Sequence, residues 1–448
     1  MRTQYTVIYK NDRSDQGKCE TLDNTYRVPP ETPELFSNLI FLTAWSFLFF
    51  TGIAWILQLA LFGEKIVSVH TPVVFFSFFL ALLIISKGRV LREPLSAAWG
   101  GLFFLSFFSA VVSIVTDQRQ ALDLRGALLL AVTPILYYLL VAMVATTKIR
   151  LSQGLANNTF ILLGFISVCV AMYQSVNGYS GFFLDYMRTV GSGNYYFFGL
   201  TRPISIFSQI GPYGFFIAFL AGATLWLIVL GRTALIKIFY TLLFIMLAAL
   251  EYLTFSRSGY LCFILICLFV TSFHFSRKLS VITPILTFFL GLTLYFGAPA
   301  ISDIGRTFVN HIASDHSVYV RYEEALIYLK ILFENPYSAI FGPGLKASEL
   351  INNGVYIDNQ YLTIAITSGL LGLLIYVFAI ALLWLKLFSL ARNDPTPLRV
   401  AIAAFFATWP CVGFFAVDNS YLVLAILGLA LAPMGHAINI RGGRWALM

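Results

Sequence analysis

Apolar runs alternate with polar segments along almost the whole chain of 448 residues. A helix needs about 20 apolar residues to cross the hydrocarbon core of a bilayer, and its backbone polar groups must pair within the segment. About twelve runs meet this need, near 38–62, 70–86, 97–116, 124–147, 158–177, 209–231, 234–254, 258–274, 279–297, 360–388, 398–417 and 419–438. The pattern predicts an all-α polytopic membrane protein.

The polar segments divide the chain into parts. We expect a cytoplasmic tail, a first block of nine spans, a large loop and a last block of three spans with a short cytoplasmic C-terminus, at 1–34, 35–297, 298–359 and 360–448. The first block contains a second long loop, 178–208, which is rich in glycine and tyrosine.

Within the large loop, the sequence predicts a surface helix from Val318 to Glu334. Asp315 or Ser317 can cap its start, and Pro336 prevents its continuation. Spacings of three and four produce an apolar stripe, formed by Val318, Tyr322, Ala325, Leu329 and Leu332. A different face carries Arg321, Glu324 and Tyr328.

Charge placement predicts the topology. The chain is 59% hydrophobic and 11% charged, with a formal net charge of +8. If the N-terminus is cytoplasmic, 19 of the 29 Lys and Arg residues fall on the cytoplasmic side. This bias follows the positive-inside rule and places both termini in the cytoplasm. The basic balance therefore reflects topology rather than a nucleic-acid partner, and 178–208 and 298–359 are expected outside the cytoplasm.

Three polar constellations fall on that outer side. The first is Thr254–Tyr260, where a tight turn places Arg257 between two spans; a guanidinium there fits phosphate oxygens or snorkels to the headgroups. The second is Arg202–Pro212, where Arg202 points into the same site or has a positioning role. The third runs from Arg321 through Gly342-Pro343-Gly344 to Asp358-Asn359-Gln360-Tyr361-Leu362. An intrahelical pair of Arg321 with Glu324 is the simpler interpretation of that arginine.

Metal and redox chemistry have weak signals. His311, Asp315 and His316 form a poor ligand set in a loop, so no metal or cofactor is expected, although either histidine is an alternative general base. The five cysteines show no metal or redox spacing and are interpreted as packing residues.

Taken in order, these motifs and Gly369-Leu370-Leu371-Gly372 resemble the O-antigen ligase and polymerase superfamily over about residues 200–375. The resemblance implies a GT-C-like glycosyltransferase of the bacterial inner membrane that takes a glycan from undecaprenyl diphosphate. It also implies that Arg257 and Arg321, helped by Arg202, hold the diphosphate without a metal.

The residue at position 358 separates two branches of that superfamily. Ligases, which transfer O-antigen to lipid A core, have a His-Asn pair where this chain has Asp358 and Asn359. Aspartate at this place is more similar to polymerases of lipid-linked repeat units, in O-antigen or exopolysaccharide synthesis. Arg188 and Gly199 also fit an Arg-x10-Gly spacing that some polymerases show.

We therefore expect Asp358, Arg257 and Arg321 to be catalytic, with Asp358 orienting or deprotonating the acceptor hydroxyl. The expected substrate-binding residues are Arg202, Arg188, Asn359, Tyr361, Glu324 and His316. The expected partners are the lipid-linked oligosaccharide, membrane lipid and a chain-length regulator. The alternatives are an O-antigen ligase and, from another class, a transporter of lipid-linked oligosaccharide or anions. A transporter should place charges near the bilayer midplane, whereas this chain concentrates them in outer loops.

Overall fold

A computed structural model describes residues 153–179, 196–197, 200–205, 210–296, 316–343 and 359–414, together with residue 207 and several positions between 97 and 108. In the first helix, side chains are described from residue 161, and in 316–343 from residue 323. The N-terminal tail and the predicted spans at 38–62, 70–86, 124–147 and 419–438 lie outside the described residues, as does most of 97–116.

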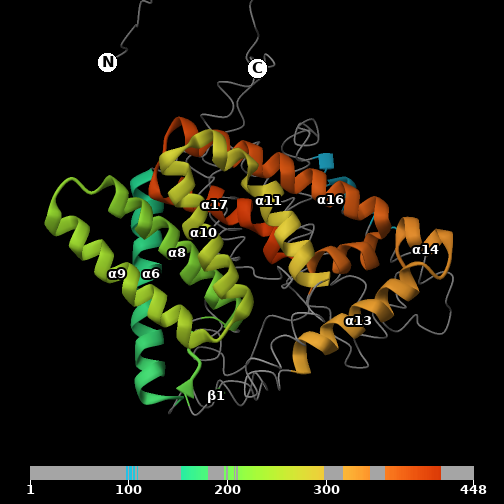
Figure 1. The fold of residues 1–448 in the computed structure, drawn as a ribbon, viewed down its shortest axis with the longest axis horizontal. Coiled ribbons are helices and arrows are strands. Elements are labelled where there is room, and N and C mark those ends of the chain that lie inside the picture. The colour runs from blue at the N-terminus through green and yellow to red at the C-terminus, as the bar shows by residue number, and fades with distance from the viewer. Residues whose placement is uncertain are drawn as a thin grey trace, which may run out of the picture.

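The described residues are almost entirely helical (Figure 1). Two short strands, β1 (Tyr196–Phe197) and β2 (Leu200–Thr201), form an antiparallel hairpin. The helices are α6 (Gln153–Asn177), α8 (Ile210–Leu230), α9 (Ala234–Thr254), α10 (Arg257–Phe275), α11 (Arg277–Phe296), α13 (His316–Leu332), α14 (Pro336–Phe341), α16 (Gln360–Asn393) and α17 (Pro397–Val412).

Five of these helices are long and apolar enough to cross a membrane, namely α8, α9, α10, α11 and α16. Their bounds agree with the predicted spans 209–231, 234–254, 258–274, 279–297 and 360–388. Shorter apolar helices occupy Ile161–Asn177 and Pro397–Val412, where the spans 158–177 and 398–417 are predicted. The prediction of an all-α membrane protein is confirmed for the described part of the chain.

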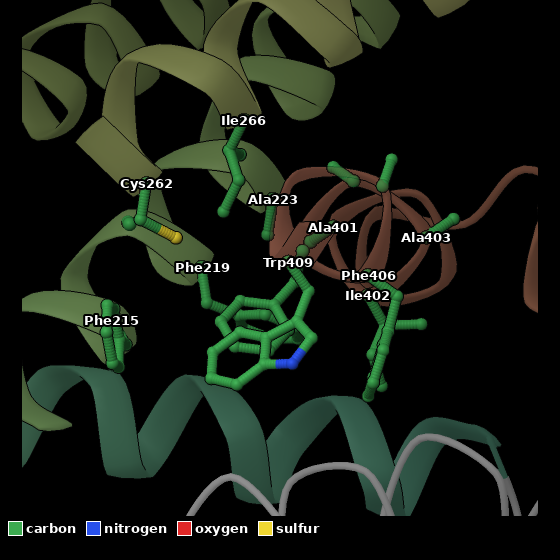
Figure 2. Packing of buried hydrophobic residues seen from close by; sticks show 14 of the residues in the cluster. Phe215, Phe219, Ala223, Cys262, Ile266, Ala401, Ile402, Ala403, Phe406 and Trp409 are labelled. Carbon is green, nitrogen blue, oxygen red and sulfur yellow. The ribbon is translucent and has the colours of Figure 1, made fainter. Parts of the chain in front are cut away.

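Helix α17 is the centre of the described core. It packs against α8, α10, α11 and α16, and nearly all of its residues are buried. Small side chains such as Ala401 and Ala404 let neighbouring helices approach its backbone, while Trp409 and Phe406 fill the space between helices. Figure 2 shows this packing, with Phe215, Phe219 and Cys262 around Trp409.

The contacts of α17 and its neighbours define two ends of the bundle. At one end, the Trp226 indole donates to the Pro395 carbonyl, and the Arg277 guanidinium donates to the Arg392 carbonyl. We call this the basic end, because it gathers Arg277, Lys278, Arg392 and Arg399. The opposite end holds the α9–α10 turn, the start of α16 and the end of α17, and we call it the motif end.

The predicted helix of the polar loop starts earlier than expected. Helix α13 begins at His316, so Ser317 lies inside it and is not its N-cap. Helix α13 ends at Leu332, before Pro336, and with Asn335 as N-cap Pro336 starts the short helix α14. Proline is suited to the first turn because that turn needs no donor from its nitrogen.

Helix α16 is broken near its start. Gly369 has φ 70° and ψ −175° inside the 34-residue helix. A side chain would strain the backbone at that φ. The break therefore separates the first turns of α16, at the motif end, from the long segment that follows.

Candidate functional site

The α9–α10 turn contains two residues between its helices. Phe255 takes a left-handed conformation (φ 49°, ψ 32°), and Ser256 caps α10 by accepting a hydrogen bond from the Gly259 amide at 3.2 Å. The Thr254 hydroxyl accepts from the Ser256 amide at 3.1 Å. This tight turn, which the sequence predicts, makes Arg257 the first residue of α10, where it is exposed.

Arg202 fastens the segment before α8 to this turn. Its Nε donates to the Thr254 carbonyl at 2.8 Å, and its Nη2 donates to the Phe255 carbonyl at 3.0 Å. These carbonyls belong to the end of α9, where the helix has acceptors without intrahelical donors. The structure thus joins two of the sequence motifs directly and gives Arg202 a positioning role.

Helix α6 holds the same segment from the other side. The Gln174 amide oxygen accepts from the backbone amides of Ile204 and Ser205, and its nitrogen donates to the Ser205 carbonyl. The Ser205 hydroxyl donates to the Ser167 carbonyl at 2.6 Å. Ser205 has a positive φ of 55°, which is uncommon for a residue other than glycine. Buried hydrogen bonds therefore fix the backbone that presents Arg202.

The third motif forms a second junction, between α13 and α16. Ala325 and Tyr328 of α13 are buried against Leu362 and Ile366 of α16. Tyr328 is fully buried beside Ala325, so the prediction that it lies on a face separate from the apolar stripe is wrong. Burial, and after it the Glu324 carboxylate, raises the pKa of Tyr328 to about 12, so its phenol stays protonated at neutral pH.

The buried face of α13 also locates position 321. Ala325, Tyr328 and Leu332 are buried and follow one another at spacings of three and four. Position 321 precedes Ala325 by four residues, so it continues this stripe by one turn toward the start of the helix. Position 321 therefore lies on the side of α13 that packs against α16.

Two glycine motifs of the sequence contact each other. A Cβ on Gly342 would lie 2.6 Å from the Ile366 carbonyl oxygen, and one on Gly369 would lie 1.9 Å from the Ile340 carbonyl oxygen. Both glycines have a positive φ. Helix α14 therefore meets α16 backbone to backbone at the break, which docks this part of the polar loop onto a membrane helix.

The start of α16 is anchored to α17. The Asn359 side chain caps α16 by accepting from the Leu362 amide at 3.0 Å. The Gln360 amide donates to the Gly413 carbonyl at 2.8 Å, and the Tyr361 hydroxyl donates to the Pro410 carbonyl at 2.9 Å. The Tyr361 ring packs against Phe414 with centroids 4.7 Å apart. The described contacts of Asn359 and Tyr361 are thus capping and packing contacts.

Helix α17 connects the two junctions. Near the start of α10, the Cys262 sulfur lies 4.0 Å from the Thr408 hydroxyl of α17. Two residues further along α17, Pro410 accepts the hydrogen bond from Tyr361. The α9–α10 turn and the start of α16 therefore lie at the same end of the bundle, on either side of the end of α17.

Two predicted site residues lie outside the described part of the chain, and two more lack described side chains. The first two are Asp358 and Arg188, and the structure describes only the backbone of Arg321 and His316. Glu324 is partly exposed on α13. Within the described residues, no group of three His, Cys, Asp or Glu side chains could hold a metal ion. The described residues thus form the α9–α10 turn that carries Arg257, which we call the arginine turn. They also form the docked helix α13 and the capped start of α16.

Sequence reasoning missed the supports behind Arg202. Gln174 and Ser167 sit in an apolar span, and the Tyr179 hydroxyl donates to the Arg202 carbonyl. The sequence did hold a clue to Gln174, because a side-chain amide among the apolar residues of a membrane helix needs a hydrogen-bond partner. Searches with this chain match no protein-family model and no curated protein.

Proposed function

We propose that the chain is a GT-C-like glycosyltransferase with about twelve spans that polymerises lipid-linked repeat units outside the cytoplasm. The supporting observation is that Arg202 bonds to the turn that carries Arg257, at the end of the bundle where α13 docks beside the start of α16. An exposed cation is thus held on a hydrogen-bonded turn, at the same end of the bundle as a helix that carries another arginine.

The placement of Arg257 favours an anionic ligand. The N-terminus of a helix has partial positive charge, so a cation in its first turn costs stability, by about 0.3–1 kcal/mol when exposed. Arg257 is the first residue of α10 and stands there despite this cost. A diphosphate would interact favourably with both the guanidinium and the helix end.

The proposed reaction is a single displacement with inversion. The acceptor hydroxyl of one lipid-linked repeat unit attacks the anomeric carbon of the growing chain, whose bond to the undecaprenyl diphosphate breaks. Asp358 takes the hydroxyl proton, and the diphosphate leaves with the bonding electrons. Arg257 and Arg321 stabilise the charge on the leaving group, while Arg202 keeps the turn in place.

Complementation of a deletion strain tests the proposal. Arg257→Ala and Arg321→Ala should each abolish long polysaccharide chains at unchanged protein level, whereas Lys278→Ala, which removes an exposed cation at the basic end, should leave chain length unchanged. Normal chain length in either arginine variant would contradict the proposal. The deletion strain without a complementing gene also distinguishes a polymerase from a ligase. Loss of a polymerase leaves one repeat on the core, and loss of a ligase leaves bare core.

A further inference from the structure

One carboxyl group is buried next to the arginine turn. Glu251 lies one turn before the end of α9, and its side chain is 3% exposed. Neither of its carboxyl oxygens has a hydrogen-bond partner among the described residues. A charged carboxylate in such a place costs several kcal/mol unless it is paired and hydrogen-bonded.

Two glycines make room for this carboxyl group. A Cβ on Gly259 of α10 would lie 2.3 Å from Glu251 Oε1, and a Cβ on Gly214 of α8 would lie 3.1 Å from the same atom. The carboxyl thus sits between α8, α9 and α10, against the two glycines.

Among the described residues, the ionisable groups around Glu251 do not compensate a negative charge. Those in electrostatic contact with it are the Tyr213 phenol of α8 and the Tyr260 phenol and Cys262 thiol of α10, which are neutral when protonated. The cations of the turn are Arg202, which bonds to backbone carbonyls, and the exposed Arg257.

We propose that Glu251 is a proton-binding site within the membrane helices, and that it carries its proton while the α9–α10 turn has the geometry described. Release of the proton to water leaves a carboxylate, which requires water or a cation and so requires the turn to open. The turn lies close to the carboxyl, because the Cβ position of Gly259 is near both Glu251 Oε1 and the Ser256 hydroxyl. The Thr254 hydroxyl also ties the main-chain carbonyl of Glu251 to the Ser256 amide. Proton release is thereby coupled to the position of Arg257, whether or not the chain is a transferase.

Infrared difference spectroscopy on the purified full-length protein in lipid nanodiscs tests this at neutral pH. Subtracting the spectrum of Glu251→Gln from that of the wild type should reveal the C=O stretch of a protonated carboxyl. Glu323→Gln is the matched control, since Glu323 is exposed and its difference spectrum should show carboxylate bands. Carboxylate bands for Glu251, as a bound sodium ion would produce, would overturn the proposal.

The stability of the same variant provides a second measurement. Glutamine has the size and neutrality of a protonated carboxyl, so Glu251→Gln should fold and unfold near the wild-type temperature at about pH 5. As the pH rises toward about 9, the folded wild type holds a proton that the unfolded chain releases, so its unfolding temperature should fall relative to the variant. A variant that fails to fold, or a difference that does not change with pH, would contradict the proposal.

Discussion

At the residue scale, the two described arginines of the motif end have different surroundings. Arg257 is exposed at the start of α10, while Arg202 is partly buried and donates to two backbone carbonyls. From the sequence, both are predicted to bind the diphosphate. In the structure, Arg257 is exposed, and Arg202 holds the backbone of the turn that carries Arg257.

Stability measurements separate these roles. Arg202→Ala should lower the free energy of unfolding by about 2 kcal/mol or more, because two hydrogen bonds from a charged donor are lost and carbonyls at the end of α9 remain unpaired. Arg257→Ala should leave it within about 0.5 kcal/mol, as expected for an exposed side chain. Thermal unfolding in detergent checks both, and equal destabilisation by the two substitutions would contradict the assignment.

The sequence could locate these arginines but not their partners. A tight turn around Arg257 follows from the polar residues between two apolar runs. The bond from Arg202 to Thr254 joins positions 52 residues apart, and no local pattern encodes it. Tyr328 is a similar case, since its spacing from Arg321 was recognised but the helix against which it packs was not. Which face of α13 is buried depends on the position of α16 as well as on the periodicity of the α13 sequence.

At the element scale, α14 and α16 depend on each other through glycine. Residues 342 and 369 have backbone conformations that suit glycine, and each places its Cα against the carbonyls of the other element. The helix bounds of the apolar spans were predictable, because composition alone defines a run of the necessary length. The break at Gly369 was not, since it arises from this contact.

Gly369→Ala should undock α14. The added methyl would lie 1.9 Å from the Ile340 oxygen at a φ that disfavours it, which should cost about 3 kcal/mol or more. Limited proteolysis should then cut the α13–α14 segment faster. Gly211→Ala is the control, because nothing lies within 4 Å of its Cβ position. Equal protease resistance in the two variants would refute the role of this contact.

At the scale of the whole molecule, the bundle has two chemically distinct ends. The turns at Arg277 and Arg392 meet at the basic end. The arginine turn and the start of α16 lie at the motif end, on either side of the end of α17. This separation agrees with the predicted grouping of loops by side. Which end faces the cytoplasm follows from the charge rule alone and stays a prediction.

Cysteine labelling in intact cells tests that orientation. In a background without the five natural cysteines, Glu334→Cys should react with a membrane-impermeant maleimide, because the polar loop is predicted outside. Asn393→Cys, at the basic end, should react only after permeabilisation. Both positions are exposed, so the comparison depends on sidedness. Reversed labelling would place the proposed site in the cytoplasm.

The break in α16 has a consequence for how the protein tolerates different lipids. The 24 residues after Gly369 suffice to cross a bilayer core of about 30 Å, and a helix of that length changes its tilt when the bilayer thickens or thins. The residues before the break are tied to α17 through Gln360 and Tyr361. A change in tilt can therefore be absorbed at Gly369, leaving Asn359 at a constant depth while the acyl chains around the protein vary in length.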